Sequence, residues 1–249
     1  SNETAKVSIG ATNSNTIGHT RFETTSNAVI SVISQISGIT VKLSGIDGSP
    51  NGYVFHKIDG ATFKADGYKA VAEMMNGVSD KTGVRAEVNN IQIMSGTVSA
   101  GTIKDLRING VMIGNITVKT NDSDAALIGA INAKKDETGV EASMENGHLV
   151  LAAKDGRAIR IAAVSTGATQ FMGAKAGASM ASAAHSAGLV YLGTITFIRQ
   201  DARDIKIGFG DLSAVLLQNM PFIGQIMRAP ELSIALMDEW EAKLEAIIN

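Results

Sequence analysis

The sequence predicts an α+β fold of repeated β-β-α-β-type modules with antiparallel hairpins, followed by a C-terminal helical tail. Three observations lead to this prediction. Residues 80–86 return in closely similar form as residues 136–142, an offset of 136 − 80 = 56 positions. Both copies follow a run of apolar residues at helical spacing. Asn-Gly and Asp-Gly pairs, which tolerate the positive φ of tight hairpin turns, separate short apolar segments. Repeats of this length bury a shared core or build an array, which favours assembly over catalysis.

The composition describes a folded protein with no marked attraction to polyanions. The chain has 249 residues, 45% of them hydrophobic, which suffices for one large domain or two small ones. Its net charge is −2 and its basic residues are scattered, so we expect no nucleic-acid partner. The absence of cysteine excludes disulfides and thiolate metal sites. We identify no signal peptide and no apolar run that could span a bilayer, and expect no membrane partner.

The N-terminal part is predicted to hold a leading strand segment, residues 1–38, and a first module, residues 39–100. Strands over residues 39–43 and 52–56 flank a Gly-Ser-Pro-Asn-Gly turn. A helix follows with Asp66 as its candidate cap, and its apolar face is formed by Tyr68, Val71, Met74, Met75 and Val78. A strand over residues 84–88 then leads toward residues 91–94.

The second module, residues 101–165, follows the same plan with clearer turn signals. Its strands are expected at residues 103–108, 111–118, 140–144, 148–152 and 158–162, divided by Asn109-Gly110, Asn146-Gly147 and Asp155-Gly156. We expect the last three strands to form a meander. Between the hairpins, Asp122 or Ser123 can cap a helix whose apolar face is formed by Leu127, Ile128 and Ile131.

Six residues are predicted to turn the chain. They are Gly83, Gly139, and the two pairs Asn109-Gly110 and Asn146-Gly147. Gly83 and Gly139 occupy the same place in the repeat. Each should end a helix with positive φ and lead Val84 or Val140 into a sheet. We therefore expect a β-branched residue at position 139 to destabilise the second module.

The remaining chain divides into a surface excursion with a closing hairpin, residues 166–211, and a helical tail, residues 212–249. Residues 162–188 are rich in Ala, Gly, Ser and Thr and hold few large apolar side chains. Residues 189–199 and 204–208 are expected to pair as a hairpin. In the tail, Leu232, Leu236 and Trp240 follow at a spacing of four, which suggests self-association through an apolar helix face. The isolated chain is accordingly expected to be a monomer or a weak dimer.

The sequence predicts no catalytic, cofactor-binding or metal-binding residues, and no enzyme. The histidines lie far apart and none belongs to a zinc-binding helix motif. Residues 208–213 begin like a dinucleotide fingerprint but lack its third glycine, and residues 121–124 begin like a calcium loop without its glycine and distal glutamate. We interpret two charged pairs as turn residues with solvated charges: Asp155 with Arg157, and Asp201 with Arg203.

Several segments together resemble a known family. The run from Asp105 to Gly114, followed by Ala130-Ile-Asn-Ala133 and Thr138 to Ala142, resembles the Ile-Asn module of bacterial flagellins. The resemblance extends through residues 147–151 and 155–161. Residues 8–12, 17–24 and 201–205 resemble the flanks of the central region in long flagellins of epsilonproteobacterial type. The shared order of these segments covers most of residues 6 to 208.

The resemblance implies a structural protein without a cofactor: the surface-exposed middle of the extracellular flagellar filament subunit, involved in motility. Its implied partners are other flagellin subunits in the full-length protein, and host antibodies. Because the terminal helices of flagellins are missing, we expect a fragment that cannot polymerise alone. The family's outer surface is often O-glycosylated, which makes candidates of Ser165, Thr166, Thr169, Ser179, Ser182 and Ser186.

Three alternatives remain open. A hook-associated flagellar protein can carry the same Ile-Asn module, although residues 17–24 favour flagellin. An adhesin or glycan-binding module is disfavoured because only 4% of residues are aromatic. A protease inserted in a flagellin would be expected to carry a zinc-binding helix, which is missing. The tail, residues 212–249, departs from the family pattern and is left unassigned.

Overall fold

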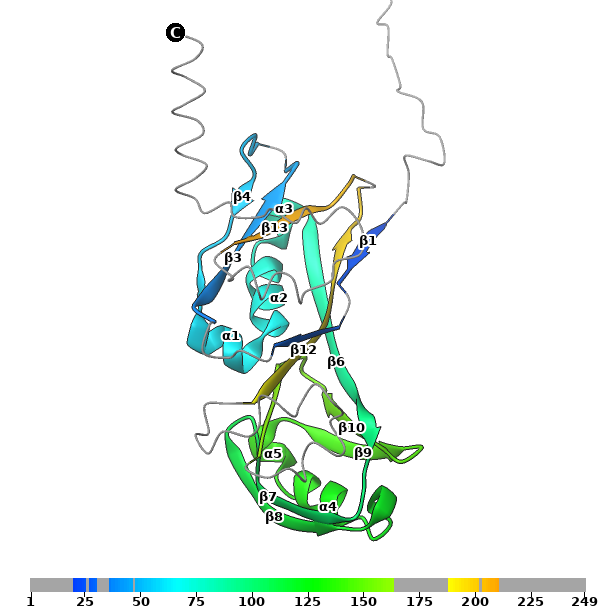
Figure 1. The fold of residues 1–249 in the computed structure, drawn as a ribbon. Helices are drawn as coiled ribbons and strands as arrows, with labels where there is room; N and C mark the ends of the chain where they lie inside the picture. The colour runs from blue at the N-terminus through cyan, green and yellow to red at the C-terminus, as the bar shows by residue number, and fades with distance from the viewer. Residues whose placement is uncertain are drawn as a thin grey trace, which may run out of the picture.

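The computed structural model describes residues 20–25, 27–30, 36–46, 48–163, 188–201 and 203–210. They form an elongated body of two lobes that are joined by two long strands, β6 and β12 (Figure 1). The helices are few and the described strand pairings are antiparallel, so the predicted α+β class is confirmed. The six candidate glycosylation residues and the whole tail, residues 212–249, lie outside the described residues.

The larger sheet has nine strands and extends through both lobes. Its main order is β8 (Val111–Val118), β7 (Gly101–Ile108), β11 (Ile159–Ala162), β12 (Leu189–Arg199), β6 (Val84–Thr97), β10 (His148–Ala153) and β9 (Glu141–Glu145). Two further strands pair with β12, and they are β1 (Arg21–Thr24) and β2 (Ala28–Ile30). The leading segment of the chain therefore completes this sheet.

The smaller sheet lies in the upper lobe of Figure 1 and has four strands. They are β13 (Lys206–Gly210), β3 (Gly38–Ser44), β4 (Tyr53–Val54) and β5 (Ile58–Asp59). The helices of this lobe are α1 (Gly60–Asp66), α2 (Tyr68–Asn76) and α3 (Ser79–Thr82). The lower lobe holds α4 (Ala126–Asn132), α5 (Lys135–Thr138) and the 3-10 turn η2 (Thr120–Asp122). No helix among the described residues is long and apolar enough to cross a membrane.

Each lobe has its own apolar core. In the upper lobe, Tyr68, Val71 and Met75 of the predicted helix face are fully buried in the same core as the sheet residue Phe197. Met74 is only partly buried, and Val78 lies beyond the end of α2. In the lower lobe, the core is formed by the α4 face and the inner side of the sheet, including Leu127, Ile131, Leu149, Leu151 and Ile159. Because the hydrophobic effect scales with buried apolar area, each core stabilises its own lobe.

Strand β6 belongs to both units. Residues 84–89 pair with β12, and from Asn90 onward the strand pairs with β10 instead. The sequence predicted two strands here, over residues 84–88 and 91–94, but they are one continuous strand of 14 residues. Its burial alternates with the period of two that a sheet requires.

Two predicted strand pairings are wrong. The expected meander fails because β10 and β11 are separated by β6 and β12 in the sheet order. The expected hairpin of residues 189–199 and 204–208 fails because β13 leaves β12 and pairs with β3. In both cases a local turn signal marks where the chain bends, whereas the two cores decide which strands become neighbours.

Helix capping is also partly different from the expectation. Asp66 is the last residue of α1 and caps nothing, because α1 begins earlier, at Gly60. Asp59 is the cap, and its Oδ1 accepts from the N–H of Ala61 at 2.8 Å and of Thr62 at 2.9 Å. In the lower lobe, Asp122 accepts from the N–H of Leu127 and Ile128 at 2.9 and 3.0 Å, so it caps α4 from a buried position in η2.

Candidate functional site

In the described part of the chain, the histidines and the partial motifs noted in the sequence do not form a metal site. Within the described residues, no group of three or more His, Asp or Glu side chains could hold a metal ion. His148 is used structurally, with Nδ1 2.8 Å from the carbonyl oxygen of Met94. Gly208 lies within β13, and Gly210 is the last residue of that strand.

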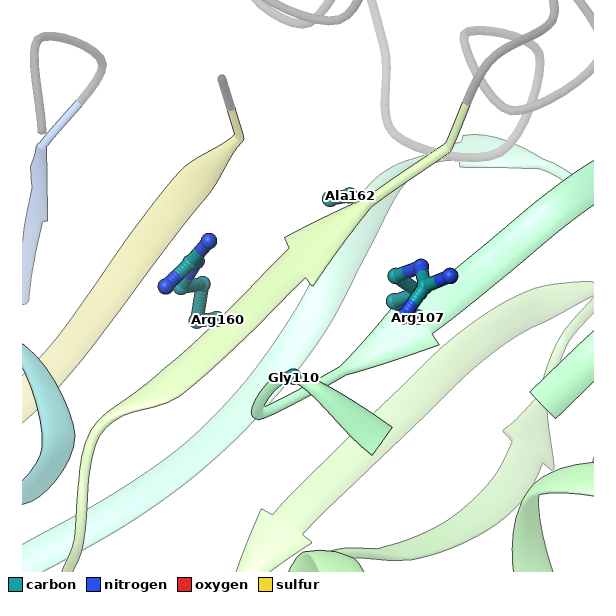
Figure 2. Close-up of a pocket in the computed structure, with 4 residues that line it drawn as sticks. All are labelled: Arg107, Gly110, Arg160 and Ala162. Carbon is teal, nitrogen blue, oxygen red and sulfur yellow. The ribbon is translucent and has the colours of Figure 1, made fainter. Parts of the chain in front are cut away.

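One small cavity lies on the outer face of the lower lobe's sheet. Its volume is about 70 Å³, and it is lined by Arg107, Gly110, Arg160 and Ala162 (Figure 2). Arg107 and Arg160 come from the neighbouring strands β7 and β11. Pockets for small molecules usually enclose about 300–1,000 Å³. This cavity is too small to bury such a ligand.

The repeated segments form two matching corners where a helix passes into a strand. Gly83 follows α3 with φ 69° and ψ 6°, and Gly139 follows α5 with φ 72° and ψ 14°. Both glycines have the left-handed backbone conformation that commonly ends a helix. The next residue in each copy, Val84 or Val140, is fully buried. The other predicted turn residues lie in two hairpin loops, Asn109-Gly110 between β7 and β8, and Asn146-Gly147 between β9 and β10.

Side chains bond the strand backbone in the same way at both corners. The amide of Asn76 donates to the carbonyl oxygen of Ala86 and accepts from its N–H, both at 2.8 Å. Asn132 bonds Ala142 in the same two ways at 2.9 and 2.7 Å. Asn132 lies 132 − 76 = 56 positions after Asn76, which is the offset of the repeat.

Alanine at Gly139 should cost more stability than alanine at Gly83. Both changes force an L-residue into the left-handed region, at about 1–2 kcal/mol. A Cβ at Gly83 meets open space, whereas one at Gly139 lies 2.7 Å from Cζ of Arg157. Arg157 would have to move away from Asp155, to which its Nε donates at 2.8 Å. Urea unfolding of the two variants measures the difference.

Arg157→Ala provides the control for this comparison. In that background, the loss of stability caused by G139A should fall to the loss caused by G83A. An unchanged excess at Gly139 would mean that the contact with Arg157 is not its cause.

A buried polar network lies at the waist, where β6 changes partner from β12 to β10. Asn90 is fully buried, and its Nδ2 donates to the carbonyl oxygens of Arg157 at 2.7 Å and Tyr191 at 3.0 Å. Gln92 donates to Oδ1 of Asn90 at 2.6 Å and exchanges two hydrogen bonds with Asn27. The network ties Asn27, β6, β12 and Arg157, which lies just before β11, into one joint between the cores.

Gly193 lies at the same waist, in β12. It has φ 72°, and the pairing of β12 with β2 shifts register beside it. A Cβ at this position would lie 2.3 Å from the carbonyl oxygen of Asn89 and 2.8 Å from Cα of Asn90. Only glycine allows β6 and β12 to approach this closely while one of them is kinked.

Arg199 anchors the far end of β12. Its residue exposure is only 1%, and its Nε donates to Oδ1 of Asp201 at 2.7 Å. The other guanidinium nitrogens donate to the carbonyl oxygens of Gly45 at 3.2 and 3.3 Å and of Asp204 at 3.3 Å. Burial acts to raise the pKa of Asp201, but hydrogen bonds from Arg199 and Arg203 outweigh it and hold that pKa below its usual value. The interpretation of Asp201 and Arg203 as merely solvated charges is incomplete, because Asp201 also pairs with a buried arginine.

The beginning of the described chain lies beside the segment that leads into its last strand. Arg21, the first residue of β1, faces Arg199 in the sheet. Its guanidinium also forms an ion pair with Asp204 at 3.0 Å. The first and last described strands, β1 and β13, therefore both lie in the upper lobe of Figure 1.

Sequence reasoning missed five residues that fix the corners, the waist and the end of β12: Asn76, Asn132, Asn90, Gly193 and Arg199. Only the first two carried a usable signal, because both lie at the offset of the repeat. The predicted self-association residues, Leu232, Leu236 and Trp240, lie outside the described residues.

Comparison with known proteins places these features in a family. The flagellin hook IN motif matches residues 105–155, which lie in the lower lobe. Flagellin B of Helicobacter pylori (strain ATCC 700392 / 26695) is 36% identical over 221 residues, covering 86% of this chain and 42% of the relative. Flagellin A of Helicobacter felis is 34% identical over 216 residues, covering 84% of this chain and 40% of the relative. Flagellin A of Helicobacter mustelae is 36% identical over 221 residues, covering 85% and 43%. The chain thus spans about two fifths of the length of these curated relatives.

Proposed function

Because the chain belongs to the flagellin family, of epsilonproteobacterial type, we propose that it forms the outer, surface-exposed domains of a flagellin in the extracellular flagellar filament. The observation that carries this proposal is that the first and last described strands, β1 and β13, both lie in the upper lobe of Figure 1. Arg21 of β1 also forms an ion pair with Asp204, which precedes β13. A body that is attached through one lobe can project from a filament wall without interrupting it.

The proposed role is mechanical and steric rather than enzymatic. The long strands β6 and β12 run through both lobes, and the polar network at Asn90 fixes the waist between them. Such a body holds its shape while it presents surface to solvent, to neighbouring flagellin subunits and to host antibodies. No cofactor is part of this role.

We further propose that the chain is organised as two flagellin-like modules, residues 39–100 and 101–165. The matching bonds of Asn76 and Asn132, and the matching angles of Gly83 and Gly139, support this division. Residues 1–38 and 166–211 would then add strands to both modules, since β1 and β2 each pair with β12 in the shared sheet.

Two proposals concern residues outside the described part. O-glycosylation of the serines and threonines between positions 165 and 186 is motivated by the family resemblance, and an intact mass of the native-source protein equal to the sequence mass would reject it. Self-association through the tail is motivated by the spacing of Leu232, Leu236 and Trp240. It would be rejected by light scattering that gives the same monomeric mass with and without residues 230–249.

Antibody labelling of intact filaments tests the main proposal. Antibodies raised against residues 20–210 should decorate filaments of the full-length protein along their whole length in electron micrographs. Absorption of the serum with the same polypeptide should remove the decoration. Labelling that appears only after the filaments are depolymerised would place these domains inside the wall and reject the proposal.

A further inference from the structure

The two corners also control which strand edges are open. In an antiparallel strand, alternate residues point their N–H and C=O groups to opposite sides. Ala142 faces Leu151 of β10, but its N–H and C=O bond Asn132 and therefore point away from β10. Strand β9 is the last strand of the nine-stranded sheet on this side. These groups would otherwise lie on an exposed edge.

The asparagine amide reproduces what a neighbouring strand would offer. A strand residue presents one N–H donor and one C=O acceptor, and so does an asparagine side chain. The backbone groups of Val140, the preceding outward-facing residue, are bonded as well. The N–H of Val140 donates to Oγ1 of Thr138 at 3.1 Å, and that hydroxyl donates to the carbonyl oxygen of Val140 at 3.3 Å. Two successive outward-facing positions of this edge are thus bonded by side chains.

The upper lobe repeats the arrangement on β6. Residues 84–89 have β12 on one side, and β10 covers the other side only from Asn90 onward. Along the part that β10 leaves uncovered, Asn76 bonds both backbone groups of Ala86. Thr82 bonds both backbone groups of Val84, each at 3.3 Å. The same two residue types therefore cover the open edge in both lobes.

We propose that Asn76 with Thr82, and Asn132 with Thr138, close these edges against pairing with a strand of a second copy of this chain. An exposed row of N–H and C=O groups is a template for edge-to-edge association, and natural sheets protect it. Two copies could pair the same edge about a twofold axis, so a second copy is the partner with matching geometry. This inference rests on the corner geometry and is independent of the filament role.

The proposal also explains why isoleucine and asparagine are adjacent at the end of α4. Ile131 is fully buried in the lower core and fixes the helix against the sheet. Asn132 is the next residue and reaches the edge of β9. The core contact therefore holds the amide in position.

The test compares Asn132→Leu with Asn115→Ala by sedimentation velocity of the full chain over a range of concentrations. Asn115 also accepts a backbone N–H, that of Asp105 at 2.8 Å, but between two strands that are already paired. We expect N132L to associate reversibly while its circular dichroism remains that of the folded chain, and N115A to sediment like the parent. Amide exchange at Ala142 should be about tenfold faster in dilute, monomeric N132L.

A second variant separates edge pairing from general loss of stability. Ser143 is exposed on β9, and a lysine there places a charge along the edge without restoring the amide. The double variant N132L/S143K should return to a monomer. Asn76→Leu repeats the experiment in the upper lobe if N132L unfolds.

Three results would overturn the proposal. The first is a folded N132L that stays monomeric at every concentration, and the second is association that S143K does not relieve. The third is loss of the fold in both N132L and N76L, because the amides would then hold the corners together rather than close an edge.

Discussion

Alanine in place of Gly193 is expected to lower the free energy of unfolding by about 2–5 kcal/mol. Roughly 1–2 kcal/mol comes from holding an L-residue at a left-handed φ of 72°. About 1–3 kcal/mol more comes from overpacking, because the new Cβ would lie 2.3 Å from the carbonyl oxygen of Asn89. That oxygen belongs to the backbone of β6 and cannot swing aside. The strands must separate at the waist, where the Asn90 network joins the cores.

Thermal unfolding followed by circular dichroism measures this effect. A loss of about 2–5 kcal/mol corresponds to a decrease in Tm of roughly 4–20 °C for a chain of this size. Gly208→Ala is the matched control, because Gly208 also lies in a strand and a Cβ there meets no atom within 4 Å. A Gly193→Ala variant as stable as Gly208→Ala would show that β6 and β12 do not need this close approach.

Methionine in place of Arg199 is expected to cost about 2–4 kcal/mol. The change removes a buried guanidinium that bonds Asp201 and the carbonyl oxygens of Gly45 and Asp204. Breaking a fully buried ion pair costs about 3–5 kcal/mol. The expected loss is smaller here because the Asp201 side chain is 37% exposed and keeps Arg203 as a partner at 2.7 Å.

Arg203→Met is the control for this prediction, since the Arg203 side chain is 48% exposed and its ion pair should contribute about 1 kcal/mol or less. Arg199→Lys keeps the positive charge but loses the planar guanidinium. Its free energy of unfolding should lie between those of the parent and R199M. Urea unfolding gives the free energies. Equal losses for R199M and R203M would contradict the anchoring role of Arg199.

Local turn signals in the sequence located bends well and strand partners poorly. Asn109-Gly110 and Asn146-Gly147 each lie between two strands that pair with each other. Asp155-Gly156 carries the same signal, yet the strands on its two sides are separated by β6 and β12. The first two turns are tight enough to impose pairing, whereas the third only redirects the chain, and the core then decides the neighbour.

The contacts that fix the shape are long-range, which is why sequence reasoning did not find them. Arg199 reaches the carbonyl oxygen of a residue 154 positions away, and Asn90 bonds one 101 positions away. No local pattern distinguishes a buried arginine at the end of a strand from an exposed one. Asn76 and Asn132 are the exception, because the repeat places them in register even though it does not reveal what their amides bond.

A cryo-electron-microscopy reconstruction of the intact filament, assembled from the full-length protein, tests the central claim most directly. We expect the two-lobed body outside the filament wall, with Arg21 and Asp204 nearest the axis and the lobe that contains α4 farthest from it. A body packed within the wall, or one whose α4 lobe lies nearest the axis, would contradict this account.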